Sequence, residues 1–186
     1  FELGYELISN TVHPSKFTNT KGKPLNDVLS SDLGVHNDAN MPPVDSYLFE
    51  EVFYDSELEK ANIIEKIESV TVFTKIPKNS IKIPVAGGFT YSPDFAYVVK
   101  TKDNQVLNFV VETKNVDRPD SLRIEEKRKI QHAQKLFNKI SDKVQVNFKT
   151  QFSNDVVYDF IKEHIWFNSN VDVLSIFNKA LWVLGW

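Results

Sequence analysis

Apolar residues recur along the central part of this chain with two different spacings, and each spacing predicts a kind of element. In "DSELEKANIIEKIES", residues 55–69, they fall three or four positions apart, which is the period of an α-helix. Ser56 and Glu59 have the spacing of a capping box, so we expect this helix to begin at Ser56. In "SVTVFTKIP", residues 69–77, β-branched and polar residues alternate, which predicts a strand that ends at Pro77.

Two further strands are predicted over residues 94–100, "DFAYVVK", and residues 106–114, "VLNFVVETK". The letters between them, "TKDNQ", carry the Asp-Asn chemistry of a hairpin turn. A second helix is expected over residues 121–140 and a fourth strand over residues 143–149. The predicted order is helix, three strands, helix, strand. A further helix is expected in "NDVVYDFIKEHIWF", after residue 151.

We expect three parts in the chain. Residues 1–45 mix short apolar runs with turn-forming letters, so they are interpreted as an irregular segment or the remnant of a preceding domain. Residues 46–150 contain most of the predicted elements and are expected to form one domain. Residues 151–186 are expected to be a C-terminal extension, with an apolar, aromatic end. Because the sequence does not begin with Met, we expect it to be a piece of a longer protein.

The composition is typical of a soluble globular protein. Of the 186 residues, 41% are hydrophobic and 25% are charged, and no apolar run approaches the ~18 residues that a membrane span needs. We therefore expect no membrane association. The chain has no cysteine, which excludes disulfides and thiolate metal sites. A reducing compartment is consistent with this, so a cytoplasmic location is expected.

The average charge argues against a nucleic-acid partner, but the charge is unevenly distributed. The net charge is −3 and the pI is about 5.8, whereas phosphate binding needs positive charge. Residues 121–143 nevertheless contain seven Lys or Arg residues. The basic residues of the second predicted helix either contact the DNA backbone or form an ordinary solvated face: Lys127, Arg128, Lys129, Lys135 and Lys139.

Charged residues interrupt the apolar hairpin at one end. Asp94 begins the first strand, and Glu112 and Lys114 end the second, where their spacing places them on one face. Antiparallel pairing brings Asp94 opposite this segment. Two neighbouring carboxylates repel unless a cation or proton intervenes, and all-oxygen ligands suit Mg²⁺. The constellation suits phosphodiester hydrolysis, with the lysine orienting water or stabilising charge on the phosphate.

The length of the turn decides whether these charges can share a face. Directly opposed residues in an antiparallel pair have position numbers with a constant sum. Opposing Asp94 to Glu112 or Lys114 requires an even sum, and hence an odd number of turn residues. We therefore predict a three- or five-residue connection centred on Asp103 or Asn104, or a bulge that restores the parity.

Pro93-Asp94 followed by Glu112-Thr113-Lys114 resembles the PD-(D/E)xK nuclease signature. The predicted order of elements is also similar to the core of that superfamily. More narrowly, "YSPDFAYVV", "FVVETKN" and "FYDSELEK" resemble the C-terminal endonuclease domain of type III restriction enzyme Res subunits. Over roughly residues 46–150, the resemblance implies an α/β, restriction-endonuclease-like core with a mixed sheet of about four strands flanked by helices.

The resemblance also implies roles for individual residues. Asp94 and Glu112 would bind Mg²⁺, the backbone carbonyl of Thr113 would add a ligand, and Lys114 would assist the attacking water. Glu57 would support the site from the first helix. The implied partners are duplex DNA, an ATP-dependent motor domain in the same full-length chain, and a separate modification subunit. The motor is not expected within this chain, which contains no G-x-x-x-x-G-K-[ST].

Several other interpretations remain open. The E-x-K triplet alone is weak, because Glu125-Glu126-Lys127 is a second example in a predicted helix. The three charges could be ordinary charges at strand ends, and Glu57 could simply favour the helix macrodipole. A stand-alone repair or recombination nuclease of the same fold, or a non-catalytic docking module with this fold, would fit the same pattern.

Overall fold

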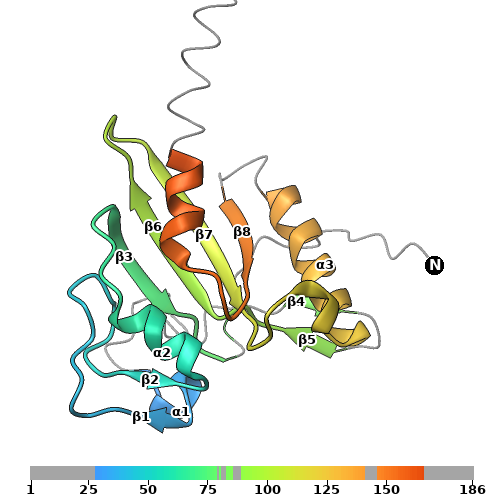
Figure 1. The fold of residues 1–186 in the computed structure, drawn as a ribbon, viewed down its shortest axis with the longest axis horizontal. Coiled ribbons are helices and arrows are strands. Elements are labelled where there is room, and N and C mark those ends of the chain that lie inside the picture. The colour runs from blue at the N-terminus through green and yellow to red at the C-terminus, as the bar shows by residue number, and fades with distance from the viewer. Residues whose placement is uncertain (1–27, 79, 81–82, 86–88, 141–145, 166–186) are drawn as a thin grey trace, which may run out of the picture. The chain divides into compact units, whose positions relative to one another are not determined.

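The computed structural model describes residues 28–165, apart from residues 79, 81–82, 86–88 and 141–145 (Figure 1). Predictions for the remaining residues lie outside this part of the chain. The chain divides into two compact units, Phe1–Asn154 and Asp155–Trp186. In the second unit, residues 157–165 are helical, as expected from the sequence. The three-part division at residues 45 and 150 stays a prediction.

A mixed four-stranded sheet forms the centre of the first unit (Figure 1). Its strands are β3 (Val70–Lys75), β6 (Phe95–Lys100), β7 (Val106–Thr113) and β8 (Val146–Gln151), in the order β3-β6-β7-β8. β6 pairs antiparallel with both β3 and β7, and β7 pairs parallel with β8. With helices α2 and α3 beside it, this is the α/β restriction-endonuclease-like core that the sequence predicted.

Helix α2 (Glu57–Ile64) begins where the capping box predicted. The Ser56 hydroxyl accepts a hydrogen bond from the Glu59 amide at 3.3 Å, which satisfies one of the free N–H groups of the first turn. In a capping box the carboxylate at N3 also accepts a hydrogen bond from the amide of the cap residue. Here the Glu59 carboxylate accepts instead from the amide of Asp55, one residue earlier, at 2.7 Å. The carboxylate of Glu59 thus reaches back to the residue before the cap.

Helix α3 (Ile124–Ile140) starts later than the sequence predicted. Residues Pro119–Ser121 form a short 3₁₀ helix, η1, and the chain is extended at Leu122 before α3 begins. The apolar side of α3 packs on one face of the sheet, where buried residues gather around it: Ile76, Ile83, Tyr91, Val110, Ala133, Phe137 and Phe148. Burial of each large side chain in such a cluster stabilises the fold by about 1.5–3 kcal/mol.

The opposite face of the sheet contains a cluster of aromatic side chains. Phe73 on β3 and Tyr97 on β6 are paired in register, and their rings stack at 5.0 Å. Phe95 and Tyr47 pack on this pair from either side. Because side chains alternate along a strand, these residues point away from the α3 face. Near the end of β7 both faces of the sheet are buried, because Val110 and Val111 point to opposite faces.

The connection between β6 and β7 has the predicted odd length. Pairing runs without a shift from Phe95↔Val111 to Lys100↔Val106, which leaves residues 101–105 in the turn. Asn104 adopts a positive φ of 64°, a conformation that Asn tolerates better than most residues. The predicted five-residue connection centred on Asp103 is confirmed, and it sets the register at the other end of the hairpin.

Several short elements were not predicted. They are α1 (Ser30–Leu33) and two small sheets, β1 (His36–Asn37) with β2 (Phe53–Tyr54) and β4 (Ile83–Val85) with β5 (Phe89–Tyr91). Strands of two or three residues are too short to show an alternating pattern.

Within the described part of the chain, no helix is both long and apolar enough to cross a bilayer.

Candidate functional site

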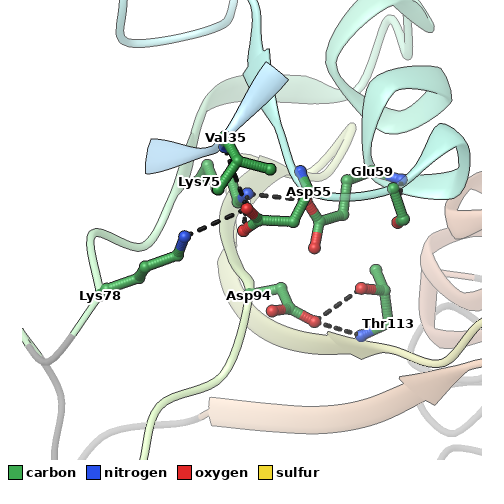
Figure 2. A network of polar contacts seen from close by, with 8 residues as sticks. Val35, Asp55, Glu59, Lys75, Lys78, Asp94 and Thr113 are labelled. Carbon is green, nitrogen blue, oxygen red and sulfur yellow. Dashed lines mark hydrogen bonds and ion pairs between the residues drawn. The ribbon is translucent and has the colours of Figure 1, made fainter. Parts of the chain in front are cut away.

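Asp94 is held in place at the start of β6 by its backbone and its side chain. Its amide donates to the Val111 carbonyl at 3.2 Å, and its carbonyl accepts from the Ile76 amide at 2.7 Å. Its Oδ2 accepts two hydrogen bonds from Thr113, from the amide at 2.7 Å and from the hydroxyl at 2.6 Å (Figure 2). These contacts aim the carboxylate at the end of β7.

Glu112 and Lys114 lie at that end of β7, as the sequence predicted. Glu112 is only 3% exposed, and the Lys114 ammonium lies 2.6 Å from its Oε1. The Tyr91 hydroxyl donates to its Oε2 at 2.7 Å. Sequence reasoning missed Tyr91, because the short strand β5 that carries it shows no recognisable pattern. The structure thus brings together a buried carboxylate, an ammonium and a phenol.

The negative charges of Asp94 and Glu112 are only partly compensated by the neighbouring positive charge and hydrogen-bond donors. Burial, followed by the charge of Asp94, raises the pKa of Glu112 to about 8, although Lys114 and Tyr91 oppose the shift. Burial and then the charge of Glu59 raise the pKa of Asp94, against the hydrogen bonds from Thr113. Burial acts to lower the pKa of Lys114, but Glu112 outweighs it and raises that pKa. A proton or a cation would relieve the excess negative charge.

The carboxylate that α2 directs to the site is Glu59. Glu59 is 5% exposed and its charge acts on Asp94, whereas Glu57 is exposed at the first position of the helix. Figure 2 shows one oxygen of Glu59 turned toward the side where Asp94 lies. The supporting role of Glu57 stays a prediction. The sequence signal that could have identified Glu59 is its N3 position, as the last residue of the Ser-x-x-Glu capping box.

A buried lysine on β3 fixes Glu59. The Lys75 ammonium lies 2.6 Å from Glu59 Oε2 and 3.0 Å from Asp55 Oδ2, and its side chain is 3% exposed. The Lys78 ammonium lies 3.0 Å from the other oxygen of Asp55 (Figure 2). Charges in this cluster are matched, so it can hold α2 against β3 without a bound ion.

A buried pair of amides joins α2 to the strand beside the site. Asn62 and Gln151 exchange two side-chain hydrogen bonds, at 2.6 and 3.0 Å. Gln151 is in register with Thr113, and its carbonyl accepts from the Lys114 amide at 2.8 Å. Because the two buried side-chain amides satisfy each other, they fix the helix relative to the ends of β7 and β8.

The oxygen atoms that could bind a metal at this site suit Mg²⁺ better than a metal ion that requires many protein ligands. Within the described residues, no group of three or more His, Cys, Asp or Glu side chains is arranged to hold a metal ion. Mg²⁺ commonly keeps several waters and takes one or two carboxylates. Asp94 and Glu112, with the Thr113 carbonyl, would supply such a set. The unrelieved repulsion between the two carboxylates favours a cation there.

The basic residues expected to contact DNA lie along α3, whose first turn is near this site. Arg128, Lys135 and Lys139 are exposed, and Lys127 and Lys129 are partly buried. Lys129 lies within 4.0 Å of Glu125, so part of its charge is compensated. Glu126 of the same helix lies 3.9 Å from Lys114, which places the first turn of α3 near the site. Contact between these side chains and DNA stays a prediction.

Comparison with known proteins identifies the family. The chain is 69% identical over 163 residues to the type III restriction-modification enzyme EcoPI Res subunit of Escherichia phage P1, and 68% identical over 163 residues to the EcoP15I Res subunit of Escherichia coli. These matches cover 87% of this chain and 17% of each curated relative. No solved structure matches significantly. Residues 45–155 match the family described as "Endonuclease domain", and the chain therefore belongs to this family of nucleases.

Proposed function

We propose that this endonuclease domain is the DNA-cleaving part of a type III restriction enzyme, and that it hydrolyses phosphodiester bonds of duplex DNA with Mg²⁺. The high identity to two Res subunits supports this assignment. The chain spans only 17% of their length. An ATP-dependent motor domain in the full-length chain and a separate modification subunit are therefore part of the proposal.

The observation that carries the proposal is the buried carboxylate of Glu112 and the half-buried carboxylate of Asp94 at the strand ends, with the ammonium of Lys114 beside Glu112. Burial, and after it the charge of Asp94, raises the pKa of Glu112, and Lys114 opposes only part of this shift. Asp94, Glu112 and the Thr113 carbonyl would hold the Mg²⁺ ion. When bound there, the ion would polarise a phosphoryl oxygen of the DNA and lower the pKa of a coordinated water.

The side chains around this position have separate tasks in the proposal. Lys114 is 16% exposed, so its ammonium can reach an incoming water or phosphate while remaining 2.6 Å from Glu112. There it would orient the attacking water and stabilise charge that develops on the phosphate. Thr113 holds one oxygen of Asp94 and leaves the other available. Glu59 takes the supporting role on α2, since it is the buried carboxylate whose charge reaches Asp94.

Cleavage of supercoiled plasmid, with and without Mg²⁺, tests this function. We expect nicking only with Mg²⁺, and a loss of about 10²–10³-fold in rate for Lys114→Met, the size expected when one group that stabilises transition-state charge is removed. Asp94→Asn should also abolish cleavage. Lys100→Met changes an exposed lysine on the neighbouring strand and serves as the control.

The outcomes separate the alternatives. Cleavage by both Asp94→Asn and Lys114→Met at the wild-type rate would exclude this site. Tight DNA binding without cleavage, whatever divalent ion is added, would favour a non-catalytic docking module. Melting temperatures of the folded variants must be compared in parallel, because a loss of activity through unfolding would say nothing about chemistry.

A further inference from the structure

One contact at the site comes from outside the four-stranded sheet. Tyr91 ends β5, which pairs only with β4 in a separate two-stranded sheet among the described residues, with Ile83 directly opposite Tyr91. Its hydroxyl lies 2.7 Å from Oε2 of Glu112. The phenol group of Tyr91 thus connects the small sheet to the end of β7.

The ring of Tyr91 is fixed by the core. Tyr91 is 8% exposed and belongs to the apolar cluster between α3 and the sheet, together with Ile83, Val110 and Phe137. A side chain held by packing can place a hydrogen-bond donor precisely, because few other rotamers are open to it. The chain runs from Tyr91 to Asp94 through Pro93, whose ring restricts the backbone.

The two oxygens of Glu112 consequently have different neighbours. Oε2 faces the buried Tyr91 hydroxyl, and Oε1 faces the Lys114 ammonium at 2.6 Å. A phenol is protonated at neutral pH, so the Tyr91 hydroxyl donates to Oε2. Lys114 is more accessible, with 16% of its side chain exposed. Of the two neighbours, Lys114 is thus the one that a ligand from solvent can reach.

We propose that Tyr91 is a positioning residue of the nuclease site, which holds Oε2 of Glu112 so that Oε1 faces Lys114 and the divalent cation. This inference rests on the proposed function. Groups that hydrogen-bond to a metal-binding carboxylate fix its orientation, and their loss commonly weakens metal binding by about 10–100-fold. Without the phenol, the carboxylate would lose its fixed orientation and a buried oxygen would lack a donor.

The test compares Tyr91→Phe with Tyr97→Phe in the 186-residue chain. Each change removes one hydroxyl from a buried ring, and the Tyr97 hydroxyl has no hydrogen-bond partner within the described residues. Mn²⁺ serves as the probe, because the free ion can be counted by electron paramagnetic resonance. We expect Tyr91→Phe to weaken Mn²⁺ binding about 10-fold or more, and Tyr97→Phe to leave it unchanged.

A second measurement distinguishes positioning from a structural role. In a Glu112→Gln background, Tyr91→Phe should have little further effect on Mn²⁺ affinity, because both changes act through the same carboxylate. Equal Mn²⁺ affinity for Tyr91→Phe and wild type would overturn the role of Tyr91. A wild-type chain whose Mn²⁺ binding is absent, or is unaffected by Asp94→Asn, would overturn the proposed metal site and the Tyr91 inference together.

Discussion

The cluster around Lys75 and the site around Lys114 each place an ammonium 2.6 Å from a buried carboxylate, but their charges are balanced differently. In the first, Lys75 and Lys78 face Asp55 and Glu59, so the positive and negative charges match. Burial acts to raise the pKa of Asp55, yet the hydrogen bonds from the two lysines outweigh it and lower that pKa. This cluster needs no further ion.

At the proposed nuclease site, by contrast, the ammonium of Lys114 contacts the buried carboxylate of Glu112, and the half-buried carboxylate of Asp94 adds a second negative charge. Burial raises the pKa of both, and a neighbouring carboxylate adds to each shift. Equal numbers of positive and negative charges can hold a helix on a sheet. Neighbouring carboxylates with too little positive charge beside them repel each other, and a bound cation relieves this repulsion. The balance of charge, rather than the presence of an ion pair, therefore distinguishes the proposed nuclease site from the Lys75 cluster.

The largest effect is expected for Lys75→Met. Removing this lysine leaves Glu59 buried without its nearest positive charge, which should lower the free energy of unfolding by about 3–5 kcal/mol. Lys114→Met should cost much less, because Glu112 can take up a proton in its place, as its raised pKa indicates. Urea denaturation of both variants measures the difference.

Lys60→Met is the matched control for this prediction. Lys60 lies on the same helix as Glu59 and is 2.7 Å from Asp38, but this pair is more accessible to solvent. We expect only a small loss of stability there. Equal losses for Lys75→Met and Lys114→Met would break the distinction between the two clusters.

A smaller effect is expected from pH. Because the folded protein raises the pKa of Glu112 from 4.5 to about 8, it holds a proton that the unfolded chain releases in this range. The metal-free protein should therefore lose stability as pH rises from about 4.5 to about 8. Asp55 has the opposite sign, since its lowered pKa gives stability that is lost only as pH falls below 3.8.

Unfolding curves across this pH range, with and without Mg²⁺, check the assignment. Mg²⁺ should flatten the slope, because it replaces the proton on Glu112. Glu112→Gln should remove the contribution of this residue. A metal-free protein whose stability is constant between pH 4.5 and about 8 would show that the charge at the site is compensated after all.

The smallest effect concerns α3, whose Glu126 connects the helix to Lys114. Truncating Lys127, Arg128 and Lys135 together should weaken DNA binding mainly at low salt and reduce the salt slope by up to about 3, roughly one unit for each phosphate that the variant no longer neutralises. Binding measured over a range of salt concentrations tests this.

The control changes three exposed lysines elsewhere, Lys66, Lys100 and Lys102. If both triple variants alter the salt slope equally, the α3 residues act as part of an ordinary solvated surface. A change confined to the α3 variant would extend the nuclease site along that helix.

Local sequence patterns predicted the main elements, because their causes are local. The capping role of Ser56 depends on residues one turn apart, and the β6–β7 register depends on the number of residues in one turn. The alternation of side chains along a strand placed Glu112 and Lys114 on one face at the end of β7. What pattern reasoning missed were the short strands, which contain too few residues to alternate visibly.

Local patterns thus specified the order of the core elements, the odd hairpin turn and the residue types that meet near Asp94. Tertiary packing decided which carboxylate of α2 is buried. It is Glu59 rather than Glu57, because the Asp55 amide donates a hydrogen bond to the Glu59 carboxylate and the Lys75 ammonium pairs with it. Packing also brought Tyr91 to Glu112 across 21 residues. Such contacts depend on how separate elements come together, and no local spacing records them.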